Sequence, residues 1–357
     1  MKLFFKKILL FIFPLVIIVI MMDLYLVNMN SLYKEKANGL LEHANEIEIL
    51  ILGNSHATYG VDPSSFSTFA FNLANVGQSI YFDKELTLQN LKKLKNLDYV
   101  LISLDYHSLY FSSQKGERNI WSYYGNGIKH PSEDYNKADI SPFLFGYDPR
   151  VSFSLLKKGI LNKWKFRNHD FFIDYDVELG VLLTDTIEKG YVSFSGTDST
   201  FFNTNYYTNK INGFDNLIKY STEKELVKKE LNQLIVALKN EGKQPILFST
   251  PTFKEYNTFL DSSIINNTLI DAEMLCKEHD IEFWDYAINN DFIKNEFFNP
   301  DHLNKKGAER FSKMLDLRLK LYKIQAKNKK SKKWRDFKRD TISIITYNQF
   351  DKHYEDG

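Results

Sequence analysis

The chain of 357 residues contains a single cysteine, Cys276, and no sustained excess of charge of either sign. One cysteine excludes an internal disulfide and leaves no cysteine cluster that could hold a metal ion. The histidines do not show the spacing of metal ligands either. The sequence therefore predicts no metal site, and we expect no other cofactor.

The balance of charge argues against nucleic acid as a partner. Lys and Arg total 46 against 45 Asp and Glu, which gives a formal net charge of +1, whereas nucleic-acid-binding domains are usually basic. Basic residues gather only near the end, where residues 323–339 surround Trp334 and Phe337. This basic tail, residues 321–357, is either a solvated extension or a segment that adheres to anionic lipid headgroups or polysaccharide.

Only the amino terminus carries an apolar run long enough to cross a membrane. Lysines precede residues 8–22, which are uncharged and interrupted only by Pro14, and no small-x-small cleavage site follows. Residues 5–27 can span about 30 Å of hydrocarbon. We interpret residues 1–27 as an uncleaved signal-anchor, with a cleaved signal peptide as the alternative. The lysines then face the cytoplasm, which predicts a single-pass protein of the cell membrane with an extracytoplasmic domain.

The middle of the chain alternates between buried strands and amphipathic helices. The expected strands are residues 47–52, 69–73, 99–104, 245–249 and 281–284. They are largely apolar, as parallel sheets covered on both faces require. Four helices are expected. The first begins at the cap Asp83, and the second runs from the capping-box pair Thr222 and Glu225 to Gly242. The third covers residues 264–279, and the last follows residue 302. The predicted fold class is α/β, a doubly wound parallel sheet of about five strands.

Two segments depart from this alternation. Residues 28–45 are polar and predict a spacer between the membrane and a domain at residues 46–320. Residues 106–218 are rich in Tyr, Phe, Asn, Ser and Gly without a sustained period. An irregular stretch of this length is usually functional or a subdomain. Since it leaves from the carboxyl end of a strand, we expect this insertion to form a lid or wall over Ser55.

The stretch "EILILGNSHATYG", residues 48–60, presents Ser55 directly after the first buried strand. Gly, Asn and Ser often end strands for conformational reasons alone. In doubly wound sheets, however, active sites lie beyond the carboxyl ends of the strands. Ser55 is thus either a turn residue or a nucleophile, and a nucleophilic serine needs a base.

The stretch "FFNPDHLNKKGAERF", residues 297–311, offers His302 as that base. It lies between the last strand and the last helix, in a loop that can return to the sheet edge of Ser55. The alternative is a helix-entry histidine that bonds to the backbone.

Together the two stretches resemble the SGNH (GDSL-like) hydrolase superfamily, in particular its membrane-anchored bacterial branch linked to O-acylation of cell-surface polymers. Gly53-Asn54-Ser55 is similar to the Gly-x-Ser turn of that family, and Asn299-Pro300-Asp301-His302 to its Asp-x-x-His. "FNLANVGQS", residues 71–79, is similar to the second block, which implies that the Gly77 amide joins that of Ser55 in an oxyanion hole. The resemblance covers about residues 46–320, with the insertion unmatched.

Two positions depart from the family pattern. After the third strand the family has Gly-x-Asn-Asp, whose asparagine donates to the oxyanion, but this chain has Ser103-Leu104-Asp105-Tyr106-His107. Asn299 stands where the family carries the aspartate that orients the histidine. The resemblance therefore leaves three possibilities: a triad through the neighbouring Asp301, to which the proximity of the carboxylate slightly inclines us, a Ser-His dyad, or a weak site.

The resemblance implies an extracytoplasmic serine esterase or O-acetyltransferase that acts on O-acyl groups of a cell-surface glycan. Asn54, His56 and His107 are candidates for substrate contact. The expected partners are the polysaccharide or its acyl esters and, for a transferase, a membrane acyltransferase that supplies acetyl groups. The alternative is a catalytically weak or inactive scaffold that binds a polymer or assembles a glycan-modifying complex.

Overall fold

The computed structural model describes residues 2–28, 32–111, 123, 126–128, 140–141, 144 and 187–330. Most of the predicted insertion and the tail beyond residue 330 lie outside the described residues, and so do the expectations that rest on them. The chain divides into two compact units, Met1–Ser312 and Lys313–Gly357. The sheet and the site described below belong to the first unit.

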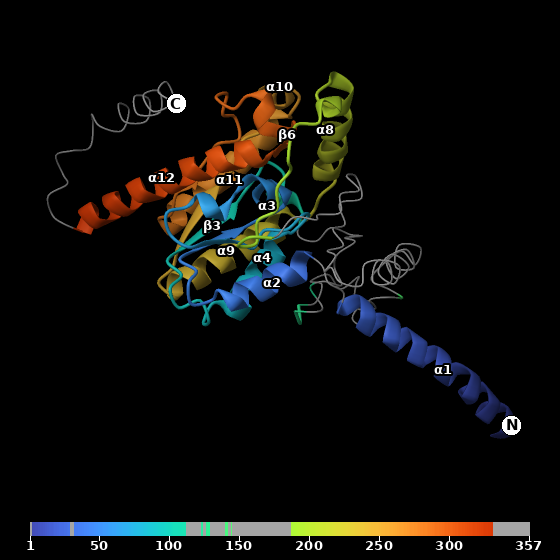
Figure 1. Ribbon diagram of the computed structural model, residues 1–357. Coiled ribbons are helices and arrows are strands. Elements are labelled where there is room, and N and C mark those ends of the chain that lie inside the picture. The colour runs from blue at the N-terminus through green and yellow to red at the C-terminus, as the bar shows by residue number, and fades with distance from the viewer. Residues whose placement is uncertain are drawn as a thin grey trace. The chain divides into compact units, whose positions relative to one another are not determined.

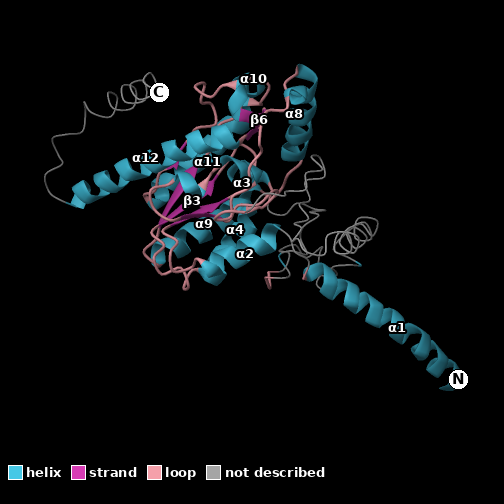
Figure 2. Cartoon of the chain, in the orientation of Figure 1, coloured by secondary structure: helices cyan, strands magenta, loops and turns pink. Residues whose placement is uncertain are grey.

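A five-stranded parallel sheet forms the centre of the first unit (Figure 2). Its strands are β1 (Ile49–Leu52), β2 (Ala70–Asn72), β3 (Tyr99–Ser103), β4 (Gln244–Phe248) and β5 (Phe283–Trp284), in the order β2-β1-β3-β4-β5. The α/β class and the five strands are confirmed. The chain leaves β1 to one side and then crosses to β3 on the other. The crevice outside the carboxyl ends of β1 and β3 is therefore the switch point, the place where such sheets bind their ligands.

Helices cover both faces of this sheet. On one face α4 (Ile80–Asn90), α9 (Lys224–Asn240) and α11 (Ser262–His279) pack against alternate strand residues, among them Leu50, Val100 and Leu247. Helices α4 and α9 lie side by side (Figure 1). On the other face, the first turns of α12 (Lys305–Lys330) place Phe311 with its ring centroid 6.3 Å from that of Phe248 in β4.

Further elements lie in the segments that connect the strands and in the segment after the sheet. Helix α3 (Ser55–Gly60) follows β1, α8 (Thr204–Lys219) ends the predicted insertion, α10 (Lys254–Asn257) follows β4, and β6 (Phe297–Asn299) pairs antiparallel with β7 (His302–Leu303). Single turns of 3₁₀ helix occupy Pro63–Ser65, Ser108–Tyr110, Ser199–Phe201 and Lys294–Glu296.

Two expected helix starts are wrong in detail. Helix α4 begins at Ile80 with Ser79 as its N-cap, so Asp83 lies inside the first turn, and its buried carboxylate accepts a hydrogen bond from Gly53 N at 3.0 Å. Helix α9 begins at Lys224 after Glu223, without the side-chain cap expected from Thr222. In the first case a tertiary contact takes the side chain that sequence assigned to a local cap.

Residues 32–42 are a folded part of the first unit rather than a polar spacer. They form α2 (Leu32–Glu42), whose Tyr33 and Leu40 pack in the same core cluster as Leu50. Lys36 is fully buried and donates its ammonium to the carbonyl of Ala74. Burial of so polar a helix depends on contacts far along the chain, which its composition does not reveal.

The amino-terminal helix α1 (Lys2–Val27) has the length and composition of a membrane span. Its stretch Lys2–Tyr25 covers 24 residues, with a mean hydropathy of 2.7 in its most apolar window. The predicted apolar helix is thus confirmed. Its orientation in a membrane remains a proposal.

Candidate active site

Ser55 stands at the point where β1 ends and α3 begins. Asn54 caps α3 by accepting the N–H of His56 on its side-chain oxygen at 2.9 Å, which leaves Ser55 as the first helical residue. The turn requires glycine at residue 53, because its φ is +137° and a Cβ there would lie 2.5 Å from the Cβ of Ser103. The local sequence thus projects Ser55 beyond the carboxyl edge of the sheet.

His302 contacts Ser55 from the β6–β7 hairpin. Its Nε2 lies 2.9 Å from Ser55 Oγ, and its Nδ1 lies 3.1 Å from the side-chain oxygen of Asn299. Since an amide oxygen only accepts, Nδ1 carries the proton and Nε2 offers its lone pair to the serine hydroxyl. The predicted pair of Ser55 and His302 is therefore brought together across 247 residues of sequence.

Asn299 is the residue that orients His302. Besides the ring, its side-chain oxygen accepts the backbone N–H groups of Asp301 at 3.0 Å and of His302 at 2.9 Å. Asn299 and His302 are also paired residues of the β6–β7 ladder. Three donors on one oxygen fix the amide, and the amide fixes the tautomer of the histidine.

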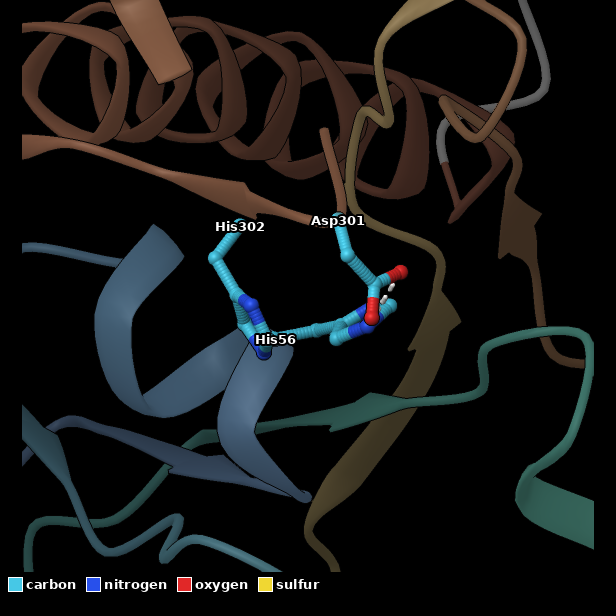
Figure 3. A group of neighbouring side chains, drawn as sticks. All are labelled: His56, Asp301 and His302. Carbon is cyan, nitrogen blue, oxygen red and sulfur yellow. Dashed lines mark ion pairs between the residues drawn. The ribbon is translucent and has the colours of Figure 1, made fainter. Parts of the chain in front are cut away.

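Asp301, which the sequence analysis slightly favoured for this role, turns elsewhere. Its Oδ1 lies 3.2 Å from Nε2 of His56, an ion pair without hydrogen-bond geometry, and both side chains are almost completely buried (Figure 3). The preference for Asp301 as orienting residue is therefore wrong in this structure. Proximity in sequence placed the carboxylate near His302 without directing it at the ring.

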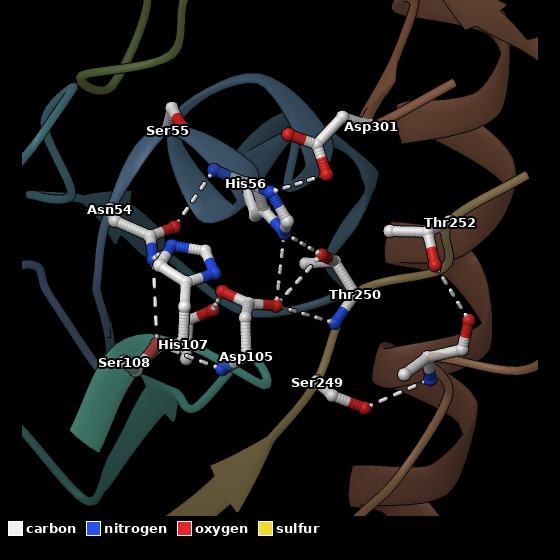
Figure 4. A network of polar contacts seen from close by, with 12 residues as sticks. Asn54, Ser55, His56, Asp105, His107, Ser108, Ser249, Thr250, Thr252 and Asp301 are labelled. Atoms are coloured by element: carbon white, nitrogen blue, oxygen red, sulfur yellow. Dashed lines mark hydrogen bonds and ion pairs between the residues drawn. The ribbon is translucent and has the colours of Figure 1, made fainter. Parts of the chain in front are cut away.

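His56 is held on its other nitrogen as well. Its Nδ1 lies 3.1 Å from Oδ1 of Asp105 and 3.2 Å from the hydroxyl of Thr250 (Figure 4). Thr250 in turn donates its hydroxyl to Asp105 at 3.1 Å, and Ser103 donates to the second oxygen of that carboxylate at 2.9 Å. A second, buried series of contacts, Asp105–His56–Asp301, thus lies beside the contacts of Ser55, His302 and Asn299.

The two histidines have opposite electrostatic environments. Burial alone lowers the pKa of His56, but the charges and contacts of Asp105 and Asp301 outweigh it and raise the pKa to about 10. Burial lowers the pKa of His302 to about 3, where the charges of His56 and Lys210 act in the same direction and Asp301 and Asp105 oppose them. His56 is thus an imidazolium at neutral pH, whereas His302 is neutral and free to accept a proton.

The two carboxylates are held ionised by the same ring. Burial tends to raise the pKa of Asp105 and of Asp301, but the charge of His56 reverses this and lowers both pKa values below the ordinary range.

The backbone N–H groups of Ser55 and Gly77 are the ones expected to form an oxyanion hole. Among the described residues, neither N–H donates a hydrogen bond, and Gly77 has a φ of +69°. Asp83 ties the two turns together, because its Oδ1 accepts Gly53 N at 3.0 Å and the side-chain amide of Gln78 at 2.7 Å. Burial raises the pKa of Asp83 to about 7.

The other candidates for substrate contact lie in different surroundings. His56 is only 3% exposed, and its side chain is held between Asp105 and Asp301; its predicted contact with substrate stays a prediction. Asn54 lies partly exposed, with its side-chain nitrogen 3.4 Å from Nε2 of His107. The ring of His107 stacks on Phe214 of α8 at 5.0 Å, and burial lowers its pKa to about 4.

The described part of the insertion lies against the site. The ring centroid of Phe194 lies 4.0 Å from that of Phe298, on which it stacks, and 4.1 Å from that of Tyr59. The Phe194 ring also lies edge-on to the His302 ring, with 6.3 Å between their centroids. The charge of Lys210 in α8 also acts on His302. Sequence reasoning missed Phe194, because its stretch has no period that would assign it a place.

Asp105 was also missed as a member of the site, and Thr250 lies beside it. Both follow apolar strands directly, Asp105 two residues after β3 and Thr250 two after β4. That position was the signal available, since parallel strands bring their carboxyl ends to one edge. A pocket next to them is lined by His56, Asp105 and Thr250 and by apolar residues such as Leu260, Leu269 and Phe283.

His56, Asp301 and His302 also satisfy a distance criterion for a metal site, with their ligand atoms within 4.8 Å of one another. A histidine ligand must offer a lone pair. His56 faces a carboxylate from each nitrogen and is protonated at neutral pH, and Nε2 of His302 faces the Ser55 hydroxyl. The three residues therefore fit an ionic network better than a metal centre.

No protein-family model matches the chain, and a search of curated proteins finds no match either. The family resemblance rests on the sequence motifs, and the chemistry must be argued from the geometry of the site.

Proposed function

We propose that this protein is an extracytoplasmic serine esterase or O-acyltransferase of the SGNH type that acts on O-acyl groups, foremost acetyl, of a cell-surface glycan. The observation that carries the proposal is the chain of contacts from Ser55 Oγ through His302 to Asn299, at 2.9 and 3.1 Å. A hydroxyl, a neutral imidazole and a fixed acceptor in this order form the arrangement that activates a serine.

In the proposed reaction, Ser55 Oγ attacks the ester carbonyl carbon while Nε2 of His302 takes the hydroxyl proton. The oxyanion that forms is stabilised by the N–H groups of Ser55 and Gly77. His302 returns the proton to the departing sugar oxygen as the carbon–oxygen bond breaks, which leaves an acyl-serine. Water or a second hydroxyl then attacks the acyl-serine and gives its proton to His302. His302 passes that proton to Ser55 Oγ as the bond between Oγ and the acyl carbon breaks, which restores the free serine.

Asn299 makes this a triad without a charge on its third member. The amide holds the tautomer, but it does not offset the positive charge that His302 acquires in the transition state. In serine proteases, replacing the aspartate by asparagine costs about ten-thousandfold in turnover, largely because the wrong tautomer is stabilised. Here the amide oxygen faces Nδ1, so the tautomer is the productive one. We therefore expect slow but measurable turnover.

The choice of a glycan ester as substrate has two supports. The apolar helix Lys2–Tyr25 is suited to tether the domain at a membrane surface, and the motifs at residues 53–55 and 299–302 resemble a family branch linked to O-acylation of cell-surface polymers. For transfer rather than hydrolysis, a membrane acyltransferase would supply the acyl group.

A fluorophosphonate probe tests the proposal on the full chain in detergent. We expect labelling of wild type at Ser55, strong reduction in His302→Gln and loss in Ser55→Ala, with Ser64→Ala as the matched control that labels normally. An unlabelled wild-type chain, shown to be folded by circular dichroism, would favour the binding scaffold instead. That alternative is favoured by the neutral Asn299 and by the missing asparagine after β3.

Location is tested separately with a reporter. Because lysines precede the span, a periplasmic-type reporter fused after residue 357 should be active and a cytoplasmic-type one inactive. The reverse pattern would contradict both the outward orientation and the glycan substrate.

A further inference from the structure

A buried histidine that the proposed reaction does not use lies against the one that it does. The ring centroids of His56 and His302 are 5.1 Å apart, with their planes at 82° (Figure 3). His56 comes from α3, directly after Ser55, whereas its two carboxylates come from the end of β3 and from the β6–β7 turn. The contacts of His56 with Asp105 and Asp301 therefore join three separate segments of the chain next to Ser55.

The charges of this cluster compensate one another only when His56 is protonated. Asp105 and Asp301 are 3% exposed each, and two buried carboxylates without a cation would be strongly unfavourable. His56 meets one of them from each ring nitrogen, at 3.1 and 3.2 Å (Figure 4). Both nitrogens then need protons, since each faces a carboxylate that can only accept.

We propose that His56 is a permanent imidazolium that takes Asp301 as its counter-ion and thereby keeps His302 unprotonated and ready to act as a base. His56 is thus a positioning residue, and the inference rests on the proposed function of Ser55 and His302. The proposal gives a role to His56, which directly follows the Gly53-Asn54-Ser55 motif and is not part of it.

The charges around His302 show why the cation matters. Asp301 and Asp105 favour the protonated ring of His302, while His56 and Lys210 oppose them. Asp301 is the carboxylate that acts most strongly on His302. Without the cation of His56, its charge would be less fully offset, and Asp301 would stabilise the protonated form of His302. A base that is already protonated cannot accept the proton of Ser55, so the cation protects the base at mildly acidic pH.

The first test uses wild-type protein. Nitrogen-15 NMR of histidine side chains in the full chain in detergent should show His56 with both nitrogens protonated from about pH 5 to pH 8. The same spectra should show His302 as the Nδ1–H tautomer throughout. A neutral His56 at pH 7 overturns the proposal.

The second test removes the cation. In His56→Gln, loss of a positive charge about 5 Å away should raise the midpoint of the His302 titration by about 1–3 pH units. Asp301→Asn should move the midpoint the other way or leave it low. The matched control is His107→Gln, which removes a neighbouring ring that is neutral at pH 7 and should leave His302 unchanged.

A structural role alone predicts a different result. His56→Gln would then lower the unfolding temperature without moving the His302 midpoint, and a folded variant with an unmoved midpoint overturns the proposal. Should the single variant fail to fold because two carboxylates lie buried together, His56→Gln combined with Asp105→Asn removes one charge of each sign. Since His56 acts on His302 more strongly than Asp105 does, the midpoint should still rise.

These readouts need no turnover, so they separate the two proposals. If Ser55 proves unreactive while the His302 midpoint shifts as stated, the proposed function fails and the electrostatic coupling stands. If the enzyme is active and the midpoint does not move, only the coupling fails. In an active enzyme, the acid limb of the pH–rate profile should shift upward in His56→Gln by the same amount as the NMR midpoint.

Discussion

Two histidines 5.1 Å apart have the same two-sided arrangement of partners and opposite protonation states. His302 lies between a hydroxyl and an amide oxygen, and it is neutral. His56 lies between two carboxylates, and it is charged. The comparison shows that burial does not by itself decide the charge of an imidazole, because charged groups that face its ring nitrogens can reverse the effect.

The two series of side-chain contacts, Ser55–His302–Asn299 and Asp105–His56–Asp301, also differ in how exposed they are. The chain of Ser55, His302 and Asn299 keeps part of its serine and histidine exposed, where a substrate can approach, whereas His56, Asp105 and Asp301 are all buried. Chemistry that moves a proton needs the first kind of surroundings, and a fixed charge needs the second. The following predictions test this division of roles, from the largest expected effect to the smallest.

Ser55→Ala should abolish hydrolysis of a simple acetyl ester. Loss of the nucleophile from a serine triad costs roughly a millionfold in turnover. The measurement is the rate of p-nitrophenyl acetate cleavage by the purified full chain, with Ser64→Ala as the control of unchanged rate. Retention of the wild-type rate in Ser55→Ala would remove Ser55 from the mechanism.

Asn299→Ala should slow the same reaction by roughly a hundredfold to ten-thousandfold, because His302 loses the acceptor that fixes its tautomer. Asn299→Asp should instead raise both the rate at neutral pH and the pKa of His302, since a carboxylate would then face Nδ1. Asp301→Asn should reduce the rate less than Asn299→Ala does. If Asp301→Asn has the larger effect, the orienting contact described above is not the working one.

His56→Gln should destabilise the fold by about 3–5 kcal/mol, the usual cost of removing one partner from a buried ion pair. The pKa of His56 is raised in the folded state, so its contribution is fully present below about pH 6.5 and is lost as pH rises towards about 10. Denaturant unfolding at several pH values between about pH 6.5 and pH 10 should show this loss in wild type and a smaller one in the variant. His43→Gln, at a surface pair with Glu46, serves as the control.

Asp83→Asn should change how stability depends on pH. The pKa of Asp83 is raised to about 7 in the folded state, so the folded chain binds more protons than the unfolded chain between about pH 4 and pH 7. Stability should therefore fall as pH rises through this range, by at most about 1.4 kcal/mol per pH unit from this group. The variant keeps an acceptor for Gly53 and Gln78 and should lose this slope; an identical slope would show that Asp83 is ionised throughout.

The order of the elements could be predicted from the sequence, for a simple reason. Short, largely apolar runs at residues 47–52 and 99–104 indicate buried strands, and polar residues that follow such strands meet at one edge. The pairing of Ser55 with His302 needed the family resemblance as well, because His302 lies in the segment after β5, the last strand of the parallel sheet, and does not follow that strand directly. The helix α2 was missed because its polar residues are buried by contacts with distant segments, such as that of Lys36 with Ala74.

The identity of the third residue was decided only by the tertiary structure. Asn299 and His302 are paired residues on facing strands of a tight hairpin, so their side chains share one side, while Asp301 lies in the turn and points to His56. An Asn-Pro pair at the start of a turn was a signal of this hairpin. The sequence by itself determined the sheet, the apolar helix and the pairing of Ser55 with His302. The charge of each histidine depended on side-chain directions and on carboxylates brought from distant strands, which no local pattern specifies.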